Sequence, residues 1–528
     1  MAKKQRKKKK KKKSKKEKSK ILSKEEEGVG DGRVVGVVNK LKRLMGEAKD
    51  PTRISRRAFE LLERLKSIQS SLPCSMGTST KEQNEKLMEW YEERMGVKRF
   101  VEMRESPGQG NGVFAKKRIE KHDLLFEVPY DMIMMESSAK KQLKLFIELC
   151  PSIGNMSSVL MALYVLAERL AGKKSKFHSY ISTLPTMFTI PICYESIKEF
   201  EYLRGTPIQM GAVSVFRVTV QQYCRLYEVI AHATTNYSES TPIRVDDFTW
   251  ENWRWAVSIV MTRQNKVPVK VSSKSDDDKV DGGVEEENIV QSLALIPLFD
   301  AINHESGGTI TTDGNPKESI LKCYAMREFK NNEQIKMFYG NRTDAEFVLY
   351  SGFLPNRPNG VKLCLDVGLD PKDPLLKLKQ MFLEKVIPVS SRTSHGLAVE
   401  IQFDTALKPK HGMQKLFSIV RIVVANKSEL EQLIRSKEQI GAQILSSENE
   451  IRTYSCLKTL CSNRLNMYPK YDGVQQKIDD LLCMDIKKLR KRVALMARKR
   501  DRSMLLSLKS YVNERMKAAV EEELKSTK

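Results

Sequence analysis

Two blocks of strand-like sequence, far apart along the chain, constrain the fold most. The first, from Val97 to Pro129, contains VKRFVEM, VFAKKRI and DLLFEVP. The second, from Leu293 to Gly352, contains LALIPLFDAIN, GTITTD, ILKCYAMREF and NNEQIKMFYG, and ends in a helical DAEFVLYS. Short runs with alternating apolar residues, separated by turn residues, predict β-strands. A sheet therefore starts in the first block and resumes in the second.

Helical periodicity dominates the rest of the chain. It predicts a helical region over residues 29–96, a helical insertion over 135–250 and an all-helical region over 353–528. The last helix, from residue 485, is basic, and we interpret its lysines and arginines as a solvated face. Local end signals predict an N-cap at Thr249 and two capping boxes, formed by Thr343 with Glu346 and by Ser428 with Glu431.

Residues 270–291 contain charge, serine and glycine with almost no core-forming periodicity, and we predict a flexible inserted loop there. With 528 residues, the chain should form two or three domains. No apolar run has the roughly 18 residues that a membrane helix needs, and no secretory signal is present, so we expect an intracellular protein without membrane contact. The nine cysteines form no C-x-x-C pair and the six histidines no H-x-x-x-H pair, so we expect no structural metal.

The N-terminus carries about half of the excess positive charge. The formal net charge is +26, and residues 1–24 contribute +14 of it. A segment such as KKQRKKKKKKKSKKEK repels itself and cannot form a core, so we predict that residues 1–28 are disordered. It is either a nuclear or nucleolar address, or a weak non-specific RNA contact, or simply a solvated arm.

Candidate site residues lie where strands end. GQGNG separates two strands of the first block, and its glycines at 108, 110 and 112 allow a tight turn and a close approach of the backbone to a ligand. From the residues alone, a plain hairpin is the better interpretation. A dinucleotide fingerprint would need a helix directly after its glycines, and VFAKKRI is strand-like. In the second block, Asn303 and His304 follow one apolar run and Tyr339 ends another, positions at which a rigid sheet can hold polar side chains.

These features together resemble the SET-domain protein methyltransferases of the Rubisco large-subunit methyltransferase-like group, and within it the members that methylate a histidine of actin. The resemblance rests on FxxYIxTLP (177–185), WAVSxVMTRQN (255–265), LALIPLxDxxNH (293–304) and FYGxRxxAEFVxxSGF (338–353). It implies an α+β fold with a SET domain over residues 97–352 and an all-helical substrate-binding domain over 353–528.

The resemblance also implies the cofactor, S-adenosyl-L-methionine, and the residues that contact it. Arg263 corresponds to an arginine that anchors the cofactor, plausibly by its carboxylate, and a helix-terminal surface arginine is the alternative. His304 has a buried structural histidine as its alternative. Relatives tend to have an acidic and an aromatic residue where this chain has Gln109 and Asn111, which weakens a side-chain role there. The expected contacts are Gln109, Gly110, Asn111, Arg263, Asp300, Ala301, Ile302, Asn303, His304 and Ser351.

On the substrate side, the resemblance makes Tyr339 the tyrosine at the methyl-transfer channel, and Phe299 and Arg342 substrate contacts. Asn265 stands where lysine-modifying relatives usually have an aromatic residue, and its amide can orient an imidazole. Phe299 stands where histidine enzymes have tryptophan, so lysine methylation remains the alternative. A non-catalytic nucleolar RNA-binding protein is a third hypothesis. We expect a monomer in the cytoplasm, with the nucleus as a second location, and actin as the protein substrate.

Overall fold

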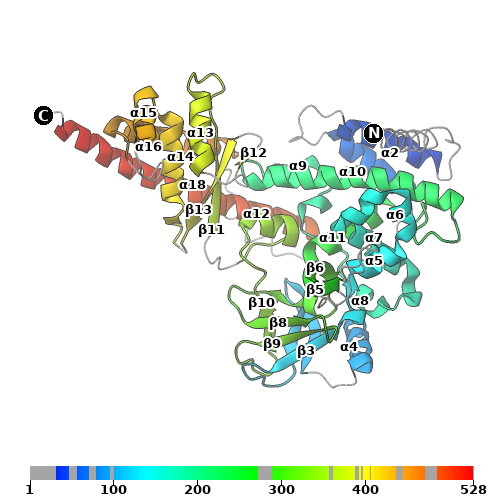
Figure 1. The fold of residues 1–528 in the computed structure, drawn as a ribbon. Coiled ribbons are helices and arrows are strands. Elements are labelled where there is room, and N and C mark those ends of the chain that lie inside the picture. The colour runs from blue at the N-terminus through cyan, green and yellow to red at the C-terminus, as the bar shows by residue number, and fades with distance from the viewer. Residues whose placement is uncertain are drawn as a thin grey trace, which may run out of the picture.

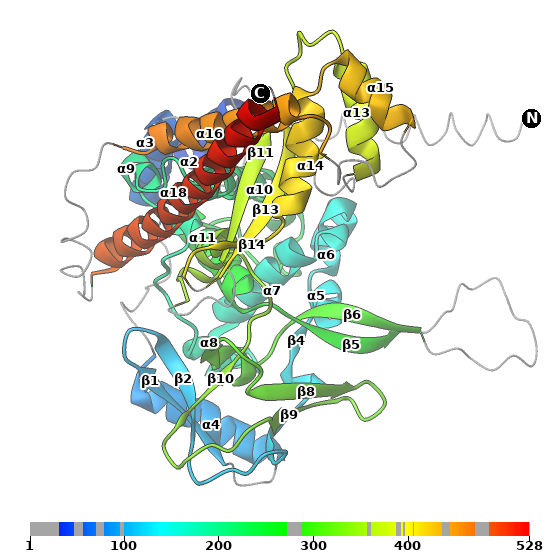
Figure 2. The same cartoon turned by 90° about the vertical axis from the view of Figure 1, so that its left-hand side faces the viewer.

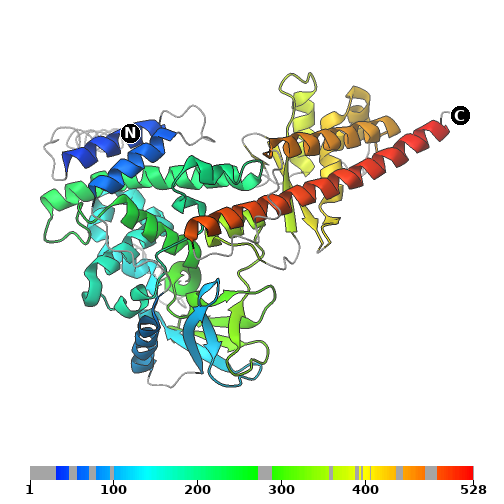
Figure 3. The same cartoon turned by 180° about the vertical axis from the view of Figure 1, so that it is seen from behind.

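The computed structural model describes residues 31–46, 56–69, 79–95, 100–271, 288–355, 361–386, 392–393, 396–404, 406–435, 444–469 and 485–526. A strand-rich part and a group of helices lie side by side, and a C-terminal domain stands apart from them (Figure 1). The long helix α18 (Ile486–Ser526) runs from the middle of the molecule along the C-terminal domain to its far end, as the view from behind also shows (Figure 3). The basic tail over residues 1–28 lies outside the described residues.

The two strand blocks of the sequence meet in two sheets. In the first sheet, β1 (Val101–Ser106), β2 (Gly110–Ala115), β10 (Gln334–Met337) and β7 (Asn303–His304) follow one another in that spatial order. β7 runs parallel to β10 and the other pairs are antiparallel. In the second, β9 (Ile320–Ala325) lies between β3 (Leu124–Pro129) and β8 (Ile310–Asn315). The SET-type mixture of strands and helices is confirmed.

A third sheet corrects the prediction of a flexible loop over residues 270–291. β5 (Asn265–Val271) pairs with β6 (Asn288–Leu295) as far as Val271 and Asn288, and β6 also pairs with β4 (Met134–Met135). The two arms project from the body of the molecule (Figure 2). The outer part of β6 is exposed, so its sequence lacks a core pattern, yet backbone hydrogen bonds to β5 still make it a strand. Residues 272–287 lie outside the described part of the chain.

Helices fill the stretch between the strand blocks, as expected for 135–250. They are α5 (Glu136–Gln142), α6 (Lys144–Leu149), α7 (Ser157–Ala171), α8 (His178–Ser182), α9 (Ile197–Glu201) and α10 (Pro207–Asn236), followed by α11 (Trp250–Arg263). The N-cap predicted at Thr249 is confirmed, because its side chain accepts a hydrogen bond from the Asn252 N–H at 3.1 Å. α11 ends at Arg263 and β5 begins at Asn265, so one short connection carries both predicted site residues.

Among the described residues, three helices precede the first strand: α2 (Gly32–Gly46), α3 (Arg56–Ile68) and α4 (Lys81–Met95). The apolar stripe of α3, including Leu62 and Leu65, is buried in the same core as the SET strands. The N-terminal helices are therefore part of the main body.

The C-terminal domain is mainly helical but not all-helical, which corrects the prediction. Its sheet consists of β11 (Val361–Val367), β13 (Gly396–Phe403), β12 (Arg392–Thr393) and β14 (Pro409–His411). Leu363, Leu365 and Val367 alternate along β11 and are buried, a strand pattern with a period of two. The helices are α13 (Leu376–Val386), α14 (Met413–Val424), α15 (Lys427–Arg435), α16 (Ser447–Met467) and α18.

The described residues form two hydrophobic cores, and α18 enters both. Ala494 and Ala497 belong to the core of the main body, whereas Met504, Leu505 and Leu508 belong to the core of the C-terminal domain. No helix among the described residues has the length and apolar character to cross a membrane. Nor do the described histidine, cysteine and acidic side chains form a group of three or more that could hold a metal ion.

Candidate active site at the strand ends

The GQGNG segment is the turn of the β1–β2 hairpin, and its Asn111 side chain points to neighbouring protein. Gly108 and Gly110 have positive φ values of 72° and 77°, and Gln109 is exposed in the turn. The Asn111 side chain donates to the Ser79 hydroxyl at 2.7 Å, just before α4. The expected cofactor contacts of Gln109, Gly110 and Asn111 therefore remain predictions that concern their backbone.

Arg263 lies at the end of α11, next to a buried carboxylate. Asp300 is 8% exposed and accepts a hydrogen bond from the Tyr180 hydroxyl. Burial raises the pKa of Asp300 to about 6, while the nearby Arg263 and the Tyr180 hydrogen bond act in the opposite direction. Among the described residues, none accepts a hydrogen bond from the Arg263 guanidinium. The guanidinium is thus held near one carboxylate while its donors stay available to an anionic ligand.

The Asn303 and His304 side chains are used mainly within the protein. The Asn303 side-chain amide donates to the Asn111 carbonyl at 3.0 Å and so ties β7 to the hairpin strand β2. The His304 Nδ1 accepts from the Tyr339 N–H at 3.2 Å, and burial lowers the pKa of His304, so the ring is neutral. Because β7 is an edge strand, its backbone groups on the side away from β10 are free of strand pairing. A main-chain contact to a ligand fits this geometry better than a side-chain contact.

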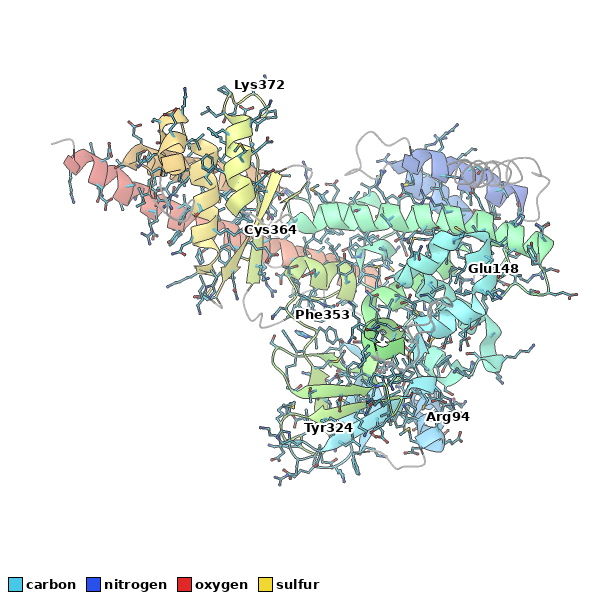
Figure 4. All side chains as sticks on the ribbon, in the orientation of Figure 1. Arg94, Glu148, Tyr324, Phe353, Cys364 and Lys372 are labelled. Atoms are coloured by element: carbon cyan, nitrogen blue, oxygen red, sulfur yellow. The ribbon has the colours of Figure 1, made fainter. Side chains whose placement is uncertain are left out.

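His304 is also the centre of an aromatic cluster. The rings of Phe338, Tyr339, Phe347 and Phe353 have their centroids 5.0 to 6.0 Å from its imidazole. Phe353 lies near the middle of the molecule, between α12 (Asp344–Glu346) and the strand-rich part (Figure 4). The cluster packs the end of β10 against the helical segment that follows it.

Tyr339 directs its hydroxyl proton inward. The hydroxyl donates to the Ile302 carbonyl at 2.8 Å, and burial raises the pKa of Tyr339 to about 12. The phenol therefore stays protonated, and its oxygen keeps acceptor capacity for a group that enters the site. Arg263 and Asp300 both influence the Tyr339 hydroxyl electrostatically, which places the three side chains in one neighbourhood.

Asn265 and Phe299 lie on the two segments that flank this neighbourhood. The Asn265 side-chain amide donates to the Arg263 carbonyl at 3.0 Å, which leaves its Oδ1 without a described donor. Phe299 is 8% exposed and follows Leu298, whose φ of 68° is rare for a residue with a side chain. The Phe299 N–H donates to the Pro297 carbonyl at 2.8 Å, so Leu298 is the centre of a strained three-residue turn at a functional segment.

Arg342 and Ser351 bind each other. The Arg342 guanidinium donates to the Ser351 hydroxyl at 3.1 Å and lies 5.9 Å from the Tyr339 ring centre. Between them, Thr343 and Glu346 form the predicted capping box of α12, and a π-helical turn covers Phe347–Ser351. The structure thus groups Arg342 with Tyr339 on the predicted substrate side, and the cofactor contact expected of Ser351 remains a prediction.

Two contributors, Tyr180 and Asn84, were not predicted from the sequence, and the close approach to a ligand expected at Gly112 is corrected. Tyr180 holds Asp300, and the motif FxxYIxTLP, which contains it, was the available signal. Gly112 was assigned a close approach to a ligand, but an added Cβ would lie 2.3 Å from the Gln334 side chain, so protein fills that space. Asn84, buried in α4, hydrogen-bonds to Asn111, and no local pattern indicates a contact across 27 residues of chain.

Comparison with known families divides the chain in the same way. Residues 110–340 match the SET domain family, and residues 370–505 match the family described as Rubisco LSMT substrate-binding. A solved structure of Rubisco LSMT bound to sinefungin and monomethyllysine has a TM-score of 0.62 at 18% identity, covering 83% of this chain and 93% of that one. A structure of Rubisco LSMT bound to AdoMet has a TM-score of 0.58 at 19% identity, with the same coverage.

Among curated relatives, the actin-histidine N-methyltransferase of Xenopus tropicalis is 29% identical over 82% of this chain and 72% of its own length. The enzyme of that name from Homo sapiens is 32% identical over 63% of this chain, and the match spans about half of that relative, 52%. The matches of both domains and the shared fold lead to one conclusion. The chain contains a region similar to the SET domain family, followed by a region similar to the Rubisco LSMT substrate-binding family.

Proposed function

We propose that this protein is an S-adenosyl-L-methionine-dependent protein-histidine N-methyltransferase, and that actin is its substrate. The names of the relatives support the reaction and the substrate, and the SET domain supports the cofactor. The observation that carries the proposal is local to the site. Arg263, Asn265 and Tyr339 each keep hydrogen-bonding capacity that no described residue uses. Arg263 and Tyr339 lie near the same buried carboxylate, and Asn265 is hydrogen-bonded to the Arg263 carbonyl.

The cofactor side of the site fits an amino-acid carboxylate. The Arg263 donors are available, and a guanidinium fork matches a carboxylate in two parallel hydrogen bonds. The free edge of β7 and the Gly110 turn offer backbone groups for the remainder of the molecule. When bound, S-adenosyl-L-methionine supplies an electrophilic methyl group, so no metal and no covalent enzyme intermediate are required.

The substrate side suits a neutral imidazole. A reference histidine has a pKa of about 6.5, so near neutral pH one ring nitrogen carries a lone pair and the other carries a proton. The free Oδ1 of Asn265 can accept that N–H, which leaves the second nitrogen as the nucleophile. The Tyr339 oxygen, whose own proton is committed to Ile302, can offer its lone pairs to the electron-poor methyl group during transfer. A lysine would first have to lose a proton from a group of pKa about 10.4.

Phe299 and Arg342 complete the proposed substrate contacts. The Phe299 ring, in the segment that leads to Asp300, offers a flat apolar surface, although it lacks the indole donor of a tryptophan. Arg342 is exposed and lies near the Tyr339 ring, so it can meet an acidic or carbonyl group of an incoming protein. In this proposal, Phe299 contacts the side chain that is methylated, and Arg342 contacts the part of the substrate protein next to it.

The direct test incubates purified protein with unmethylated actin and isotope-labelled cofactor, and locates the label by mass spectrometry. We expect the label on one histidine, and a Tyr339→Phe variant serves as the control for chemistry at this site. Label on lysine would replace the histidine assignment by the lysine alternative. If the protein neither binds the cofactor nor transfers the label, the non-catalytic RNA-binding hypothesis replaces both.

We infer further that the protein is a monomer, mainly cytoplasmic, and that the basic tail directs part of it to the nucleus or contacts RNA weakly. The +14 charge of residues 1–24 supports the role inferred for the tail. Deleting these residues should change the distribution in the cell and leave methylation of purified substrate intact. Loss of activity on purified substrate would show that the tail belongs to the working domain.

A further inference from the structure

The segment Tyr339–Pro355 follows directly from the end of β10 and carries Tyr339, Arg342 and Phe353. Inside the SET domain it is held by few long-range polar contacts. One is the Thr189 hydroxyl, which donates to the Gly352 carbonyl at 2.5 Å. Gly352 has a φ of 78°, and an added Cβ would lie 2.2 Å from the Thr189 oxygen, so the segment and the Thr189 loop pack closely.

One arginine of α18 also binds this segment at two places, at Asp344 near its start and at Pro355 at its end. The Arg500 Nη1 donates to both carboxylate oxygens of Asp344 at 3.0 and 3.2 Å, and its Nη2 donates to the Pro355 carbonyl at 2.9 Å. The two side chains of the ion pair are 16% and 14% exposed, so solvent screens them little. Asp344 begins α12, directly after Thr343 and two residues after Arg342. Arg500 therefore links the start and the end of the helical excursion that follows Tyr339.

The residue next to Arg500 faces the other domain. The Asp501 carboxylate accepts hydrogen bonds from the Arg464 guanidinium of α16 at 3.1 and 3.0 Å, and from the Tyr468 hydroxyl. Asp501 is 7% exposed. Two successive residues of one helix thus join the C-terminal domain to the segment after Tyr339.

A second arginine of α18, near the start of the helix, contacts the loop that holds Gly352. Arg490, 4% exposed, donates its Nε to the Phe188 carbonyl at 3.0 Å. Phe188 precedes Thr189, whose hydroxyl holds Gly352. Ala494 and Ala497 between the two arginines are buried in the main core. Because α18 is one continuous helix from Arg490 to Asp501, it fixes the positions of these residues relative to one another and to the segment.

We propose that Arg500 is a positioning residue, through which the C-terminal domain sets the geometry of Tyr339 and its neighbours. This inference rests on the proposed methyltransferase function. It adds a second task to a domain whose family description concerns substrate binding. Methyl transfer requires a narrow range of geometries, and a misplacement of about 1 Å can reduce the rate roughly a hundredfold. Loosening the Tyr339–Pro355 segment should therefore lower turnover without releasing the cofactor, because the anchor expected at Arg263 lies outside the segment.

The test compares Arg500→Met with Lys499→Met in the full-length protein. Lys499 is exposed on the same helix, so its variant has the same change of charge without the contacts to Asp344 and Pro355. Three quantities are measured: amide hydrogen exchange of the peptides covering residues 340–355, the dissociation constant of S-adenosyl-L-methionine, and kcat with KM for the actin peptide. For Arg500→Met we expect faster exchange and a kcat roughly ten- to hundredfold lower, with an unchanged cofactor dissociation constant. Lys499→Met should match the wild type.

The proposal is wrong if exchange in 340–355 is unchanged, or if exchange rises while kcat stays within about twofold of the wild-type value. Removing Arg500 alone leaves Asp344 buried without its partner and can prevent folding. The double variant Arg500→Met/Asp344→Asn removes both charges and decides the question in that case by the same criteria. If the wild-type protein transfers no methyl group, the proposed function fails, whereas the exchange comparison still decides whether Arg500 holds the segment.

Discussion

Two regions of the molecule place an arginine beside a buried carboxylate, and they use the arginine differently. In the C-terminal domain, Arg421 of α14 and Glu450 of α16 are 8% and 5% exposed and form two hydrogen bonds, one of them at 2.9 Å between Nη2 and Oε2. In the SET domain, Asp300 is equally buried, but its hydrogen bond comes from Tyr180, and the nearby Arg263 donates to no described residue. The first pair is internally satisfied, and the second has unused donors.

We interpret the first arginine as structural and the second as kept for a ligand. Burying a charge is costly unless hydrogen bonds compensate it, and Arg421 is compensated entirely within the fold. Leaving a half-buried guanidinium without hydrogen-bond acceptors makes sense if an anionic group supplies them. The comparison therefore predicts that changes in the first region affect stability, whereas changes in the second affect binding and turnover.

The largest expected effect is on stability in the C-terminal domain. Arg421→Met should lower the free energy of unfolding by about 3 to 5 kcal/mol, because it leaves Glu450 buried without its partner. Thermal and urea unfolding of the full-length protein measure this. The folded fraction should bind S-adenosyl-L-methionine as the wild type does. A loss of cofactor affinity in folded protein would break the distinction between the two regions.

The buried carboxylate of the SET domain predicts a stability that depends on pH. The pKa of Asp300 is raised from 3.8 to about 6 in the folded protein, so folding favours the protonated form. This contribution is fully present below pH 3.8 and is lost as the pH rises through about 6, by up to about 3 kcal/mol. Asp300→Asn should flatten the dependence of unfolding free energy on pH between these values. Asp313→Asn, on an exposed strand position, is the matched control and should leave the wild-type slope.

Tyr339→Phe should lower turnover roughly a hundredfold, about 2.7 kcal/mol, because the substituted ring offers no oxygen lone pair to the methyl group during transfer. Cofactor affinity should be retained, since the hydroxyl donates to Ile302 and Arg263 is unchanged. Single-turnover rates and cofactor titration, carried out on the same preparation, measure both quantities. Unchanged turnover would remove Tyr339 from the mechanism.

A smaller effect, about tenfold or 1.4 kcal/mol, is expected for substrate choice. Asn265→Phe replaces the free Oδ1 by an apolar wall, so methylation of a histidine peptide should fall relative to its lysine counterpart. The ratio of the two specificity constants is the proper measure, because damage to the fold would lower both together. The Asn265 side chain also donates a hydrogen bond to the Arg263 carbonyl. Asn265→Ser, which has a shorter side chain, serves as the control for loss of this hydrogen bond. An unchanged ratio would reduce Asn265 to a helix-terminal cap.

The sequence predicted what local patterns determine. The strand blocks, the cap at Thr249 and the capping box at Thr343 depend on residues close together in the chain, and all three are confirmed. The second capping box was placed two residues too late. Asn426 and Glu429 form it, with hydrogen bonds of 2.9 and 3.0 Å. Asparagine is as good a cap as serine, so the pattern alone could not choose between them.

Features that depend on distant parts of the chain were missed. The arginines of the last helix were interpreted as a solvated face, whereas Arg490 is buried and Arg500 is largely buried, both against the main body. The bond between Arg342 and Ser351 arises from the π-helical turn between them, which sequence periodicity does not indicate. At the site, the sequence predicted residues that lie close together in the structure. It did not predict that the side chains of Asn111, Asn303 and His304 form hydrogen bonds with other protein groups.

The central claim is that Arg263 is kept for an anionic group of the cofactor, and calorimetric titration of S-adenosyl-L-methionine into wild type and Arg263→Met tests it most directly. The account predicts a dissociation constant higher by roughly ten- to a hundredfold, the value of charged hydrogen bonds at about 1.5 to 3 kcal/mol. Thermal stability without cofactor should fall less than in Arg421→Met, because the variant loses the electrostatic attraction to Asp300 but no internal hydrogen bond of the guanidinium. Unchanged affinity together with a large loss of stability would show that Arg263, like Arg421, is a structural residue.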